Sequence, residues 1–347
     1  MGWWRNWKGA TAVIAVATFT LLAGCRPELE PLAPEVFAME RPDHFPDFAP
    51  FGDTEVTEAG FALGRRLFYD TKLSADSSVS CASCHAQVHA FADHNVRFST
   101  GVGGALGTRN SPGLLNLAWH PTFMMDGGIT HLEVQPLAPL NLAHEMAMDL
   151  QVLANRLGLD SDYPALFAEA FGEGETPVTG QRILLALTQF QVMLVSASSK
   201  YDAVYTGNEG FAADEARGYA LFQTHCAACH TEPLLTDFSF VNTGLDMHSE
   251  DVGRYSITLN PADSGAFVVP SLRNVALTRP FMHDGRFWSL EQVVAFYATD
   301  VQDNGRLDDR LPGPLPLTAE DQADLVAFLK TLTDHEFTSD KRWMDPR

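Results

Sequence analysis

Two short stretches, Cys81-Ala-Ser-Cys84-His85 and Cys226-Ala-Ala-Cys229-His230, decide the fold, and both follow the pattern C-x-x-C-H. Two thiols at this spacing can each form a thioether with one vinyl group of a single porphyrin, and the adjacent histidine can bind the iron. A thioredoxin-like C-x-x-C needs no trailing histidine, and these two pairs lie too far apart in sequence for a zinc knuckle. The two stretches therefore predict two covalently bound c-type haems, with His85 and His230 as axial ligands.

The fifth cysteine ends an N-terminal stretch that is typical of an exported lipoprotein. Residues 1–25 begin with tryptophans and basic residues, continue through an apolar run over 10–23, and end in Leu22-Ala-Gly-Cys25. The run is shorter than the roughly 20 residues that a membrane span needs, and small residues precede the cysteine, as in a cleaved signal peptide. The sequence predicts a periplasmic protein held to a membrane only by lipid on Cys25, with the Pro-rich residues 26–50 as a tether.

The chain is strongly acidic. It has 23 Lys and Arg against 44 Asp and Glu, which gives a formal net charge of −21. This charge argues against a nucleic-acid partner. It suits a basic electron-donor protein that is steered by charge, and it equally suits simple solubility.

An internal repeat extends beyond the haem motifs. Pro112-Gly-Leu-Leu-Asn116 is followed by Phe123-Met-Met-Asp-Gly127, and at the same spacing Pro270-Ser-Leu-Arg-Asn274 is followed by Phe281-Met-His-Asp-Gly285. The repeat predicts two haem domains, residues 51–197 and residues 198–347, with the boundary within residues 196–211.

Helical periodicity dominates both copies, and strand-type alternation is almost absent. Helices are predicted before each haem motif, over residues 179–200, and from Thr318, which with Asp321 forms a capping signal. The apolar residues expected on the inner faces of these helices are Leu63, Leu67, Phe68, Tyr219, Ala220, Phe222, Ile183, Leu184, Leu187, Phe190, Leu194, Leu325, Phe328 and Leu329. The predicted fold is all-α, with two cytochrome-c-like haem domains related by an internal repeat.

The two halves differ at the position expected to cover each haem. Ser289 and Gln292 predict a helix start, and the apolar spacing that follows puts Tyr297 on the buried face. The repeat-equivalent of Tyr297 is Pro139, whose side chain cannot bind iron. A haem with two strong axial ligands only carries electrons, whereas a haem with an open face can bind peroxide. The asymmetry predicts a reactive first haem and a six-coordinate second haem.

Polar residues flank Pro139. Gln135 and Glu145 offer a hydrogen-bonding group and a carboxylate that could move a proton between peroxide oxygens as their bond breaks. Taken alone, both would be ordinary surface residues.

The motifs together resemble the bacterial dihaem cytochrome c peroxidase family, which also contains MauG, the enzyme that matures a tryptophan-derived cofactor in methylamine dehydrogenase. The resemblance covers nearly all of the mature chain. It is carried by Leu63-Gly-Arg-Arg-Leu-Phe-Tyr-Asp70, Cys81–His85, Gly107-Thr-Arg-Asn-Ser-Pro112, Met125-Asp-Gly127, Cys226–His230, Pro270–Asn274 and Met282-His-Asp-Gly285.

The resemblance implies roles for individual residues. Gln135, Pro139 and Glu145 match the distal pocket of a peroxidatic N-terminal haem with His85 on the proximal side, and His230 would hold the electron-transferring haem. The side chain of Asn110 and the backbone carbonyls of Thr278 and Pro280 match a calcium site between the domains, which suits a cation that prefers oxygen ligands.

The chain also departs from the family pattern. Val102 stands where peroxidases that need reductive activation carry a distal histidine, so the first haem should be open without activation. Tyr297 stands where the peroxidases have methionine and MauG has tyrosine, with Met282 as the alternative ligand of the second haem. Met125 replaces the family's tryptophan between the haems, which puts fast charge sharing between them in doubt.

The expected activity is reduction of hydrogen peroxide to water with electrons from a small cytochrome c or cupredoxin. One alternative is a MauG-like, peroxide-dependent oxidation of residues in a partner protein. The other is a dihaem electron carrier, which would need a strong ligand over the first haem from His89, His94, Met124 or Met146. A homodimer is left open.

Overall fold

The computed structural model describes Met1, residues 36–48 and residues 55–347. The predicted signal peptide and Cys25 therefore lie outside the described residues. Within the described part of the chain, no helix is long and apolar enough to cross a membrane. The described strands are β1 (Phe240–Val241) and β2 (Phe267–Val268), which pair antiparallel with Phe240 opposite Val268. The structure is otherwise built from helices and loops, as the sequence predicts.

The helices follow the internal repeat. Those of the first half are α1 (Glu58–Tyr69), α2 (Cys81–Cys84), α3 (Leu137–Asn141), α4 (Leu150–Gly158), α5 (Tyr163–Phe171) and α6 (Gly180–Val192). Those that follow are α7 (Lys200–Tyr205), α8 (Ala213–His225), α9 (Tyr255–Thr258), α10 (Leu290–Thr299), α11 (Ala319–Lys330) and α12 (His335–Ser339). Short 3-10 segments are η1 (Thr71–Leu73), η2 (Gln87–His89), η3 (Val102–Gly104), η4 (Leu117–Trp119), η5 (Leu132–Val134), η6 (Pro261–Asp263) and η7 (Val275–Leu277).

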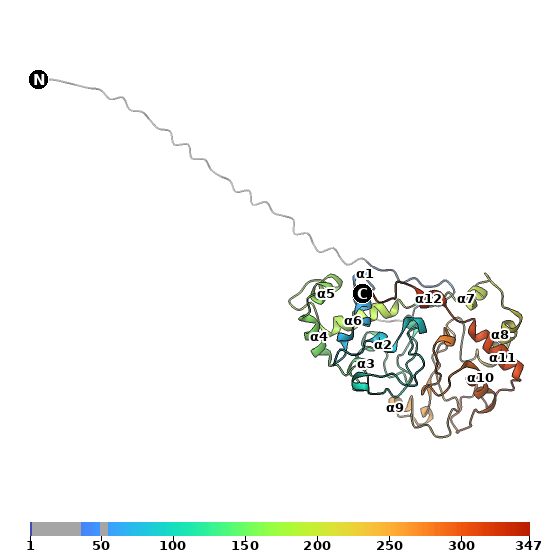
Figure 1. Ribbon diagram of the computed structural model, residues 1–347. Helices are drawn as coiled ribbons and strands as arrows, with labels where there is room; N and C mark the ends of the chain where they lie inside the picture. Colours follow the sequence, from blue (N-terminus) through green and yellow to red (C-terminus); the bar gives the residue numbers. More distant parts are fainter. Residues whose placement is uncertain (2–35, 49–54) are drawn as a thin grey trace. The chain divides into compact units, whose positions relative to one another are not determined.

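Each half is centred on one closely packed helix pair, α1 with α6 and α8 with α11 (Figure 1). A Cβ added at Gly64 of α1 would lie 1.9 Å from the carbonyl oxygen of Ala186, and one at Gly218 of α8 would lie 2.0 Å from that of Asp324. Only glycine lets the two backbones approach so closely. The matching glycines show that the sequence repeat is also a repeat of packing.

Most of the predicted helix faces are confirmed. Leu63, Leu67 and Phe68 are buried on α1, and α11 begins after Thr318, whose side chain accepts from the backbone N–H of Asp321. Ala220 is exposed, so its predicted inward position is wrong. It lies two residues from the buried Phe222, which on a helix is nearly the opposite face.

The helix predicted over residues 179–200 ends early, at Val192. The backbone beyond it bonds to the first half instead of continuing the helix. The carbonyl oxygen of Leu194 accepts from the backbone N–H of Asn116, and the backbone N–H of Ser196 donates to Asn116 Oδ1 at 2.9 Å.

The two halves meet at Ser196 through repeat-equivalent asparagines. The side-chain amide of Asn116 donates to the Ser196 carbonyl oxygen at 3.1 Å, and that of Asn274 donates to Ser196 Oγ at 2.9 Å. Both asparagines have left-handed backbone, with φ of 54° and 59°, a conformation that asparagine tolerates better than most residues. Ser196 Oγ in turn donates to the buried Asp334. The first residue of the predicted boundary is thus fixed by both halves.

Two of the three hydrophobic clusters lie mostly on either side of the predicted boundary, and the third joins Phe45 and Trp119 to Leu234 of the second half. Residues 56–194 supply one cluster and residues 201–332 the other, but Phe337 and Trp343 pack into the first cluster. The end of the chain therefore returns to the first half, which a division at residues 197 and 198 does not anticipate.

The described part of the predicted tether, residues 36–48, also packs against the body. Phe45 is 2% exposed, and Trp119 of the first half donates to the Pro46 carbonyl oxygen at 2.9 Å. His44 Nε2 lies 2.9 Å from Asp202 Oδ1, in the second half. These residues contact both halves and do not stand free as a spacer.

Candidate haem sites

The first haem motif starts a short helix and orients its histidine. The backbone N–H of Ser80 donates to Ser83 Oγ at 3.0 Å, which caps α2, and the N–H of His85 donates to the Cys81 carbonyl oxygen at 2.9 Å. His85 Nδ1 lies 2.8 Å from the Phe91 carbonyl oxygen and must donate to it, because a carbonyl only accepts. This leaves Nε2 free for iron and fixes the ring, as expected for a metal-binding histidine.

The second motif repeats this arrangement at the end of α8. The N–H of His230 donates to the Cys226 carbonyl oxygen at 2.9 Å. His230 Nδ1 lies 3.2 Å from the Leu235 carbonyl oxygen and 3.1 Å from that of Pro270. Burial lowers the pKa of both His85 and His230. Each imidazole is therefore held neutral, which is the form that binds metals.

The thiols of both motifs also fit covalent attachment. The four cysteines form no disulfide with one another. Burial, helped by the neighbouring thiol, raises the pKa of Cys81 and of Cys226 to about 12. Each half thus presents two half-buried thiols beside an imidazole with one free ring nitrogen. These are the groups that a c-type haem requires.

The structure brings Pro139 and Glu145, two of the predicted distal residues of the first haem, close together. Pro139 lies in α3, and its carbonyl oxygen accepts from the backbone N–H of Met146, the residue after Glu145. The pKa of Cys84 is raised mainly by burial and further by the charges of Asp93 and Glu145. Glu145 therefore lies close to a haem-attaching thiol, which favours a pocket residue over an ordinary surface carboxylate.

The pKa of the Glu145 carboxyl group is shifted in the direction that suits a proton carrier. Burial raises the pKa of its carboxyl group, and the neighbouring His144 opposes the shift only in part. His144 Nε2 lies 3.8 Å from Glu145 Oε1. A raised pKa brings a carboxyl group closer to neutral pH, where it can both give and take a proton.

The loop over residues 98–104 packs against the backbone of Glu145. The backbone N–H of Val102 donates to the Glu145 carbonyl oxygen at 2.8 Å. A Cβ on Gly101 would lie 2.3 Å from the His144 carbonyl oxygen and 2.4 Å from that of Glu145. The predicted position of Val102 beside the distal residues is therefore supported, and the loop supplies no imidazole there.

Gln135 contacts a residue that the sequence suggested only as an alternative ligand. Its side-chain amide donates to the sulfur of Met124 at 3.7 Å. Met124 has left-handed backbone, with φ of 67°. Nothing in the spacing predicts this contact, because it joins a turn to the end of η5.

Beside α3, an apolar hollow of about 400 Å³ is lined by Ile129, Val134, Leu137, Ala138, Asn141 and Leu142.

Of the other residues considered as ligands of the first haem, His89 and His94 lie elsewhere, whereas Met146 adjoins Glu145 and its backbone N–H donates to the Pro139 carbonyl oxygen. His89 and His94 stack on each other with ring centroids 3.8 Å apart, and His94 Nε2 is 3.4 Å from Arg279 Nη2 of the second half. Met146 is 5% exposed within the first core. Neither histidine is in contact with Gln135, Pro139 or Glu145.

Tyr297 lies near the thiols of the second motif. It is carried by α10, whose N-cap is Ser289, as predicted. Burial raises the pKa of Tyr297, and the charges of Cys226 and Cys229 raise it further. Its hydroxyl has no hydrogen-bond partner among the described residues. Met282 lies in the turn before Gly285 with φ of 71°. Which of the two binds iron stays a prediction.

The predicted calcium ligands lie at one joint between the halves. The backbone N–H of Asn110 donates to the His283 carbonyl oxygen at 2.8 Å, and its side-chain amide donates to the carbonyls of Val96 and Arg97. Thr278 packs against Gly113, and Pro280 against Gly285. In the described part of the chain, no group of three or more His, Cys, Asp or Glu residues could hold a metal. A cation here would rely on amide and carbonyl oxygens.

Met125, which replaces the family's tryptophan, also lies at this joint. Its carbonyl oxygen accepts from the backbone N–H of Val268 in β2 at 2.8 Å. Beside it, Arg109 bonds Asp126 of its own half and Asp251 of the other half, both at 2.6 Å. The position is therefore a contact between the halves, and its side chain is not an aromatic ring.

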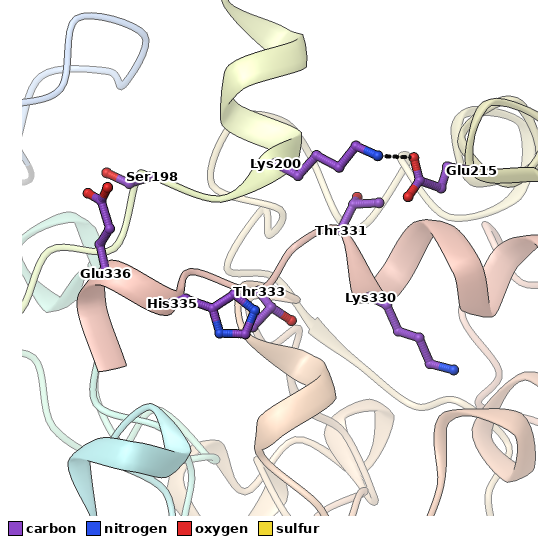
Figure 2. A pocket seen from close by; sticks show the side chains of 8 residues that line it. All are labelled: Ser198, Lys200, Glu215, Lys330, Thr331, Thr333, His335 and Glu336. Carbon is purple, nitrogen blue, oxygen red and sulfur yellow. Dashed lines mark hydrogen bonds and ion pairs between the residues drawn. The ribbon is translucent and has the colours of Figure 1, made fainter. Parts of the chain in front are cut away.

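A separate polar hollow of about 460 Å³ contains no predicted site residue (Figure 2). Lys200 and Glu215 pair across part of it at 2.6 Å. Its lining residues are Ser198, Lys200, Glu215, Lys330, Thr331, Thr333, His335 and Glu336.

Comparison with known proteins agrees with this geometry. A family model described as di-haem cytochrome c peroxidase matches residues 58–210, and one described as cytochrome c matches residues 215–333. The methylamine utilization protein MauG of Methylorubrum extorquens is 37% identical, over 80% of this chain and 79% of that protein. The cytochrome c551 peroxidase of Pseudomonas aeruginosa is 31% identical, over 80% of each.

Solved structures show the same likeness. A MauG-like protein associated with microbial copper homeostasis has a TM-score of 0.81 and 34% identity, over 89% of this chain and 99% of that chain. The diheme peroxidase BthA of Burkholderia thailandensis has a TM-score of 0.72 and 28% identity, over 82% of this chain and 88% of that chain. The all-α fold, the two c-type haems and the oxidoreductase class are thereby confirmed. The chain belongs to the di-haem cytochrome c peroxidase family, which includes MauG.

Proposed function

We propose that the protein reduces hydrogen peroxide to water at its first haem site, with electrons that enter through the second. The observation that carries the proposal is the partly buried carboxyl group of Glu145, with its raised pKa, close to the thiol of Cys84. Cytochrome c peroxidases among the relatives support the same activity.

Each haem-site residue has a distinct task in this proposal. A c-type haem held by Cys81, Cys84 and His85 supplies the redox chemistry when bound. Glu145 carries a proton from one peroxide oxygen to the other, and Gln135 orients the peroxide by hydrogen bonding. The contact with Met124 restrains the Gln135 amide, which reduces the reorganisation needed when peroxide binds.

The second site would pass electrons to the first. His230 would hold the iron of the second haem together with Tyr297, with Met282 as the alternative to Tyr297. The closeness of Tyr297 to the Cys226 and Cys229 thiols supports this choice. An oxygen ligand would favour higher oxidation states than a thioether would.

We also propose where the protein is located, which proteins donate electrons to it, and that it binds calcium. The lipoprotein signature ending at Cys25 supports a periplasmic protein held to a membrane by lipid. The net charge of −21 supports a basic cytochrome c or cupredoxin as donor. A calcium ion held by Asn110, Thr278 and Pro280 would brace the joint between the halves.

A second candidate function is MauG-like oxidation of residues in a partner protein. Tyr297 favours it, as do the relatives named MauG. Met125 weakens it, because a thioether replaces the aromatic ring between the haems. A pure electron carrier has the least support, because the chain belongs to a family of enzymes.

Turnover assays separate these functions. The full-length holoprotein is mixed with hydrogen peroxide and a reduced small cytochrome, and oxidation of the cytochrome is followed optically. Peroxide-dependent, catalytic oxidation supports the peroxidase. Reaction with peroxide but no oxidation of any cytochrome or cupredoxin donor would favour the MauG-like alternative, and no reaction with peroxide would contradict both.

A further inference from the structure

A buried ion pair of the second half lies under residues 36–48, here called the N-terminal segment. The guanidinium of Arg273 donates to both carboxylate oxygens of Asp202, at 2.9 and 2.7 Å, and the two side chains are 1% and 4% exposed. The same carboxylate accepts from the backbone N–H of Ser199 at 2.9 Å, as part of the capping box of α7. Because a two-pronged arginine–carboxylate pair fixes orientation as well as charge, Arg273 is held in one position.

Two residues of the N-terminal segment cover this pair. His44 Nε2 lies 2.9 Å from Asp202 Oδ1 and must donate to it, because a carboxylate only accepts. The guanidinium of Arg273 lies 4.6 Å from the centre of the Phe45 ring, which is a cation–π contact. Phe45 also packs edge-on against Trp119 of the first half, with ring centroids 5.0 Å apart. The N-terminal segment therefore closes the ion pair off from solvent and holds it against the first half.

Arg273 also joins the two loops that orient His230. The Nδ1 of His230 lies 3.2 Å from the Leu235 carbonyl oxygen and 3.1 Å from that of Pro270. Pro270 is three residues before Arg273 in the chain. At 2.7 Å, Arg273 Nη2 donates to the carbonyl oxygen of Pro233, which is two residues before Leu235. One guanidinium therefore ties together the loops that carry both acceptors of the imidazole.

Further hydrogen bonds link the same two loops. The hydroxyl of Ser271 donates to the Leu234 carbonyl oxygen at 2.7 Å. The hydroxyl of Thr236 donates to the Val269 carbonyl oxygen at 2.6 Å. The loops form one bonded unit, so a shift of the guanidinium is transmitted to both acceptors of the imidazole.

The first half cannot build the same clamp. By the internal repeat, Leu115 stands where the second half has Arg273. Leu115 is buried in the first hydrophobic cluster, and a leucine side chain can bond neither a carboxylate nor a carbonyl oxygen. His85 Nδ1 bonds the Phe91 carbonyl oxygen at 2.8 Å. The first haem therefore serves as an internal control for any effect that acts through Arg273.

We propose that His44 and Phe45 are positioning residues for the second haem site. Through Arg273 they hold the acceptors of His230 Nδ1, and thereby set the reduction potential of the haem that admits electrons. A firm bond from the Nδ1–H to a carbonyl makes an imidazole a stronger donor to iron, which stabilises the ferric form. A looser clamp should therefore raise the reduction potential. The inference rests on the proposed role of the second haem as the entry site for electrons.

The test measures the reduction potentials of both haems by spectroelectrochemical titration of the full-length holoprotein, without peroxide. The double variant His44→Leu/Phe45→Leu removes the bond to Asp202 and the ring beside Arg273, and it keeps apolar side chains at both positions. It should favour the ferrous form of the second haem by about tenfold, which is a rise of about 59 mV. The potential of the first haem should stay at its wild-type value.

Matched variants separate positioning from folding. His44→Gln keeps an N–H donor for Asp202 and should leave both potentials unchanged. The exposed Asp43→Asn, in the same segment, is the control and should also match wild type. Arg273→Lys keeps the charge but loses the forked bonds to Asp202 and Pro233, so it should raise the second potential at least as far as the double variant.

Two results would overturn the inference. One is a wild-type potential of the second haem in both the double variant and Arg273→Lys. The other is an equal shift of both haems, which would indicate general loosening. The single variant His44→Leu, at a side chain that is 13% exposed, gives the same test if the double variant does not fold. Because no peroxide is used, either result leaves the proposed peroxidase activity standing, and absence of peroxide turnover in wild type would overturn that activity alone.

Discussion

At the residue scale, the proposed peroxidase activity depends most on Glu145. Its position could be predicted only through the family resemblance, because a single glutamate in a loop has no distinguishing pattern. The structure adds a physical reason, since burial raises the pKa of its carboxyl group and its charge acts on Cys84. By contrast, the Met124 contact to Gln135 depends on a turn with left-handed backbone, which residue spacing does not reveal.

Glu145→Gln should slow peroxide-dependent turnover by about 10²–10⁴-fold, because it removes a positioned proton carrier. Both haems should stay attached, since no iron ligand changes. Stopped-flow mixing with peroxide gives the rate, and the absorption spectrum gives the haem content. The exposed Glu173→Gln is the matched control and should react like wild type.

Glu145 should also make stability depend on pH. Its pKa in the folded state is raised above the ordinary value of 4.5, so the folded protein favours the protonated form. Its contribution to stability is complete below pH 4.5 and decreases as pH rises through the folded-state pKa. As pH rises through that pKa, the free energy of unfolding of Glu145→Gln, measured with denaturant, should increase relative to that of wild type. A constant difference would contradict the raised pKa.

Substitutions of Tyr297 and of Met282 are expected to affect the second haem differently. If Tyr297 binds iron, Tyr297→Phe should convert that haem to high spin, or let water or Met282 replace the phenol, and raise its reduction potential. Met282→Leu should leave the spectrum nearly unchanged. The reverse pattern would assign the protein to the His/Met peroxidases.

At the scale of elements, the sequence was most informative about helices. Capping residues such as Thr179, Ser289 and Thr318 begin helices where predicted, because a cap is a local signal. The end of α6 was not predictable, because it is caused by bonds to Asn116, which is distant in sequence. The bonds of Arg273 to Asp202 and Pro233 were hidden for the same reason.

The closely packed helix pairs give a prediction of their own. Gly218→Ala should destabilise the protein by about 1–3 kcal/mol, because the new Cβ would meet the Asp324 carbonyl oxygen at 2.0 Å. Gly158→Ala at the end of α4 is the control, since no atom lies within 4 Å of its Cβ position. Thermal unfolding of the two variants should separate them clearly, and equal melting temperatures would argue against the close approach of α8 and α11.

At the scale of the whole molecule, two haem domains could be predicted from the repeat, but the way they join could not. The asparagines of both repeats meet at Ser196, and Phe337 and Trp343 return to the first core. These contacts join residues that are distant in sequence, and neither periodicity nor motif spacing carries that information. These contacts hold the two halves in a fixed arrangement, which the proposed electron transfer between the haems would require.

Chelation tests the proposed calcium ion at the other joint. Exhaustive removal of divalent cations should lower the melting temperature and slow peroxide turnover, because Asn110 and the Thr278–Pro280 segment come from different halves. Added calcium should restore both. If chelation changes neither melting nor turnover, no functional calcium is bound there.

The central claim is that the first haem is open and the second is closed. Electron paramagnetic resonance of the oxidised, as-isolated holoprotein tests it directly, because it reports both coordination states at once. We expect one high-spin signal from the haem at His85 and one low-spin signal from the haem at His230. A spectrum with low-spin signals alone would contradict it.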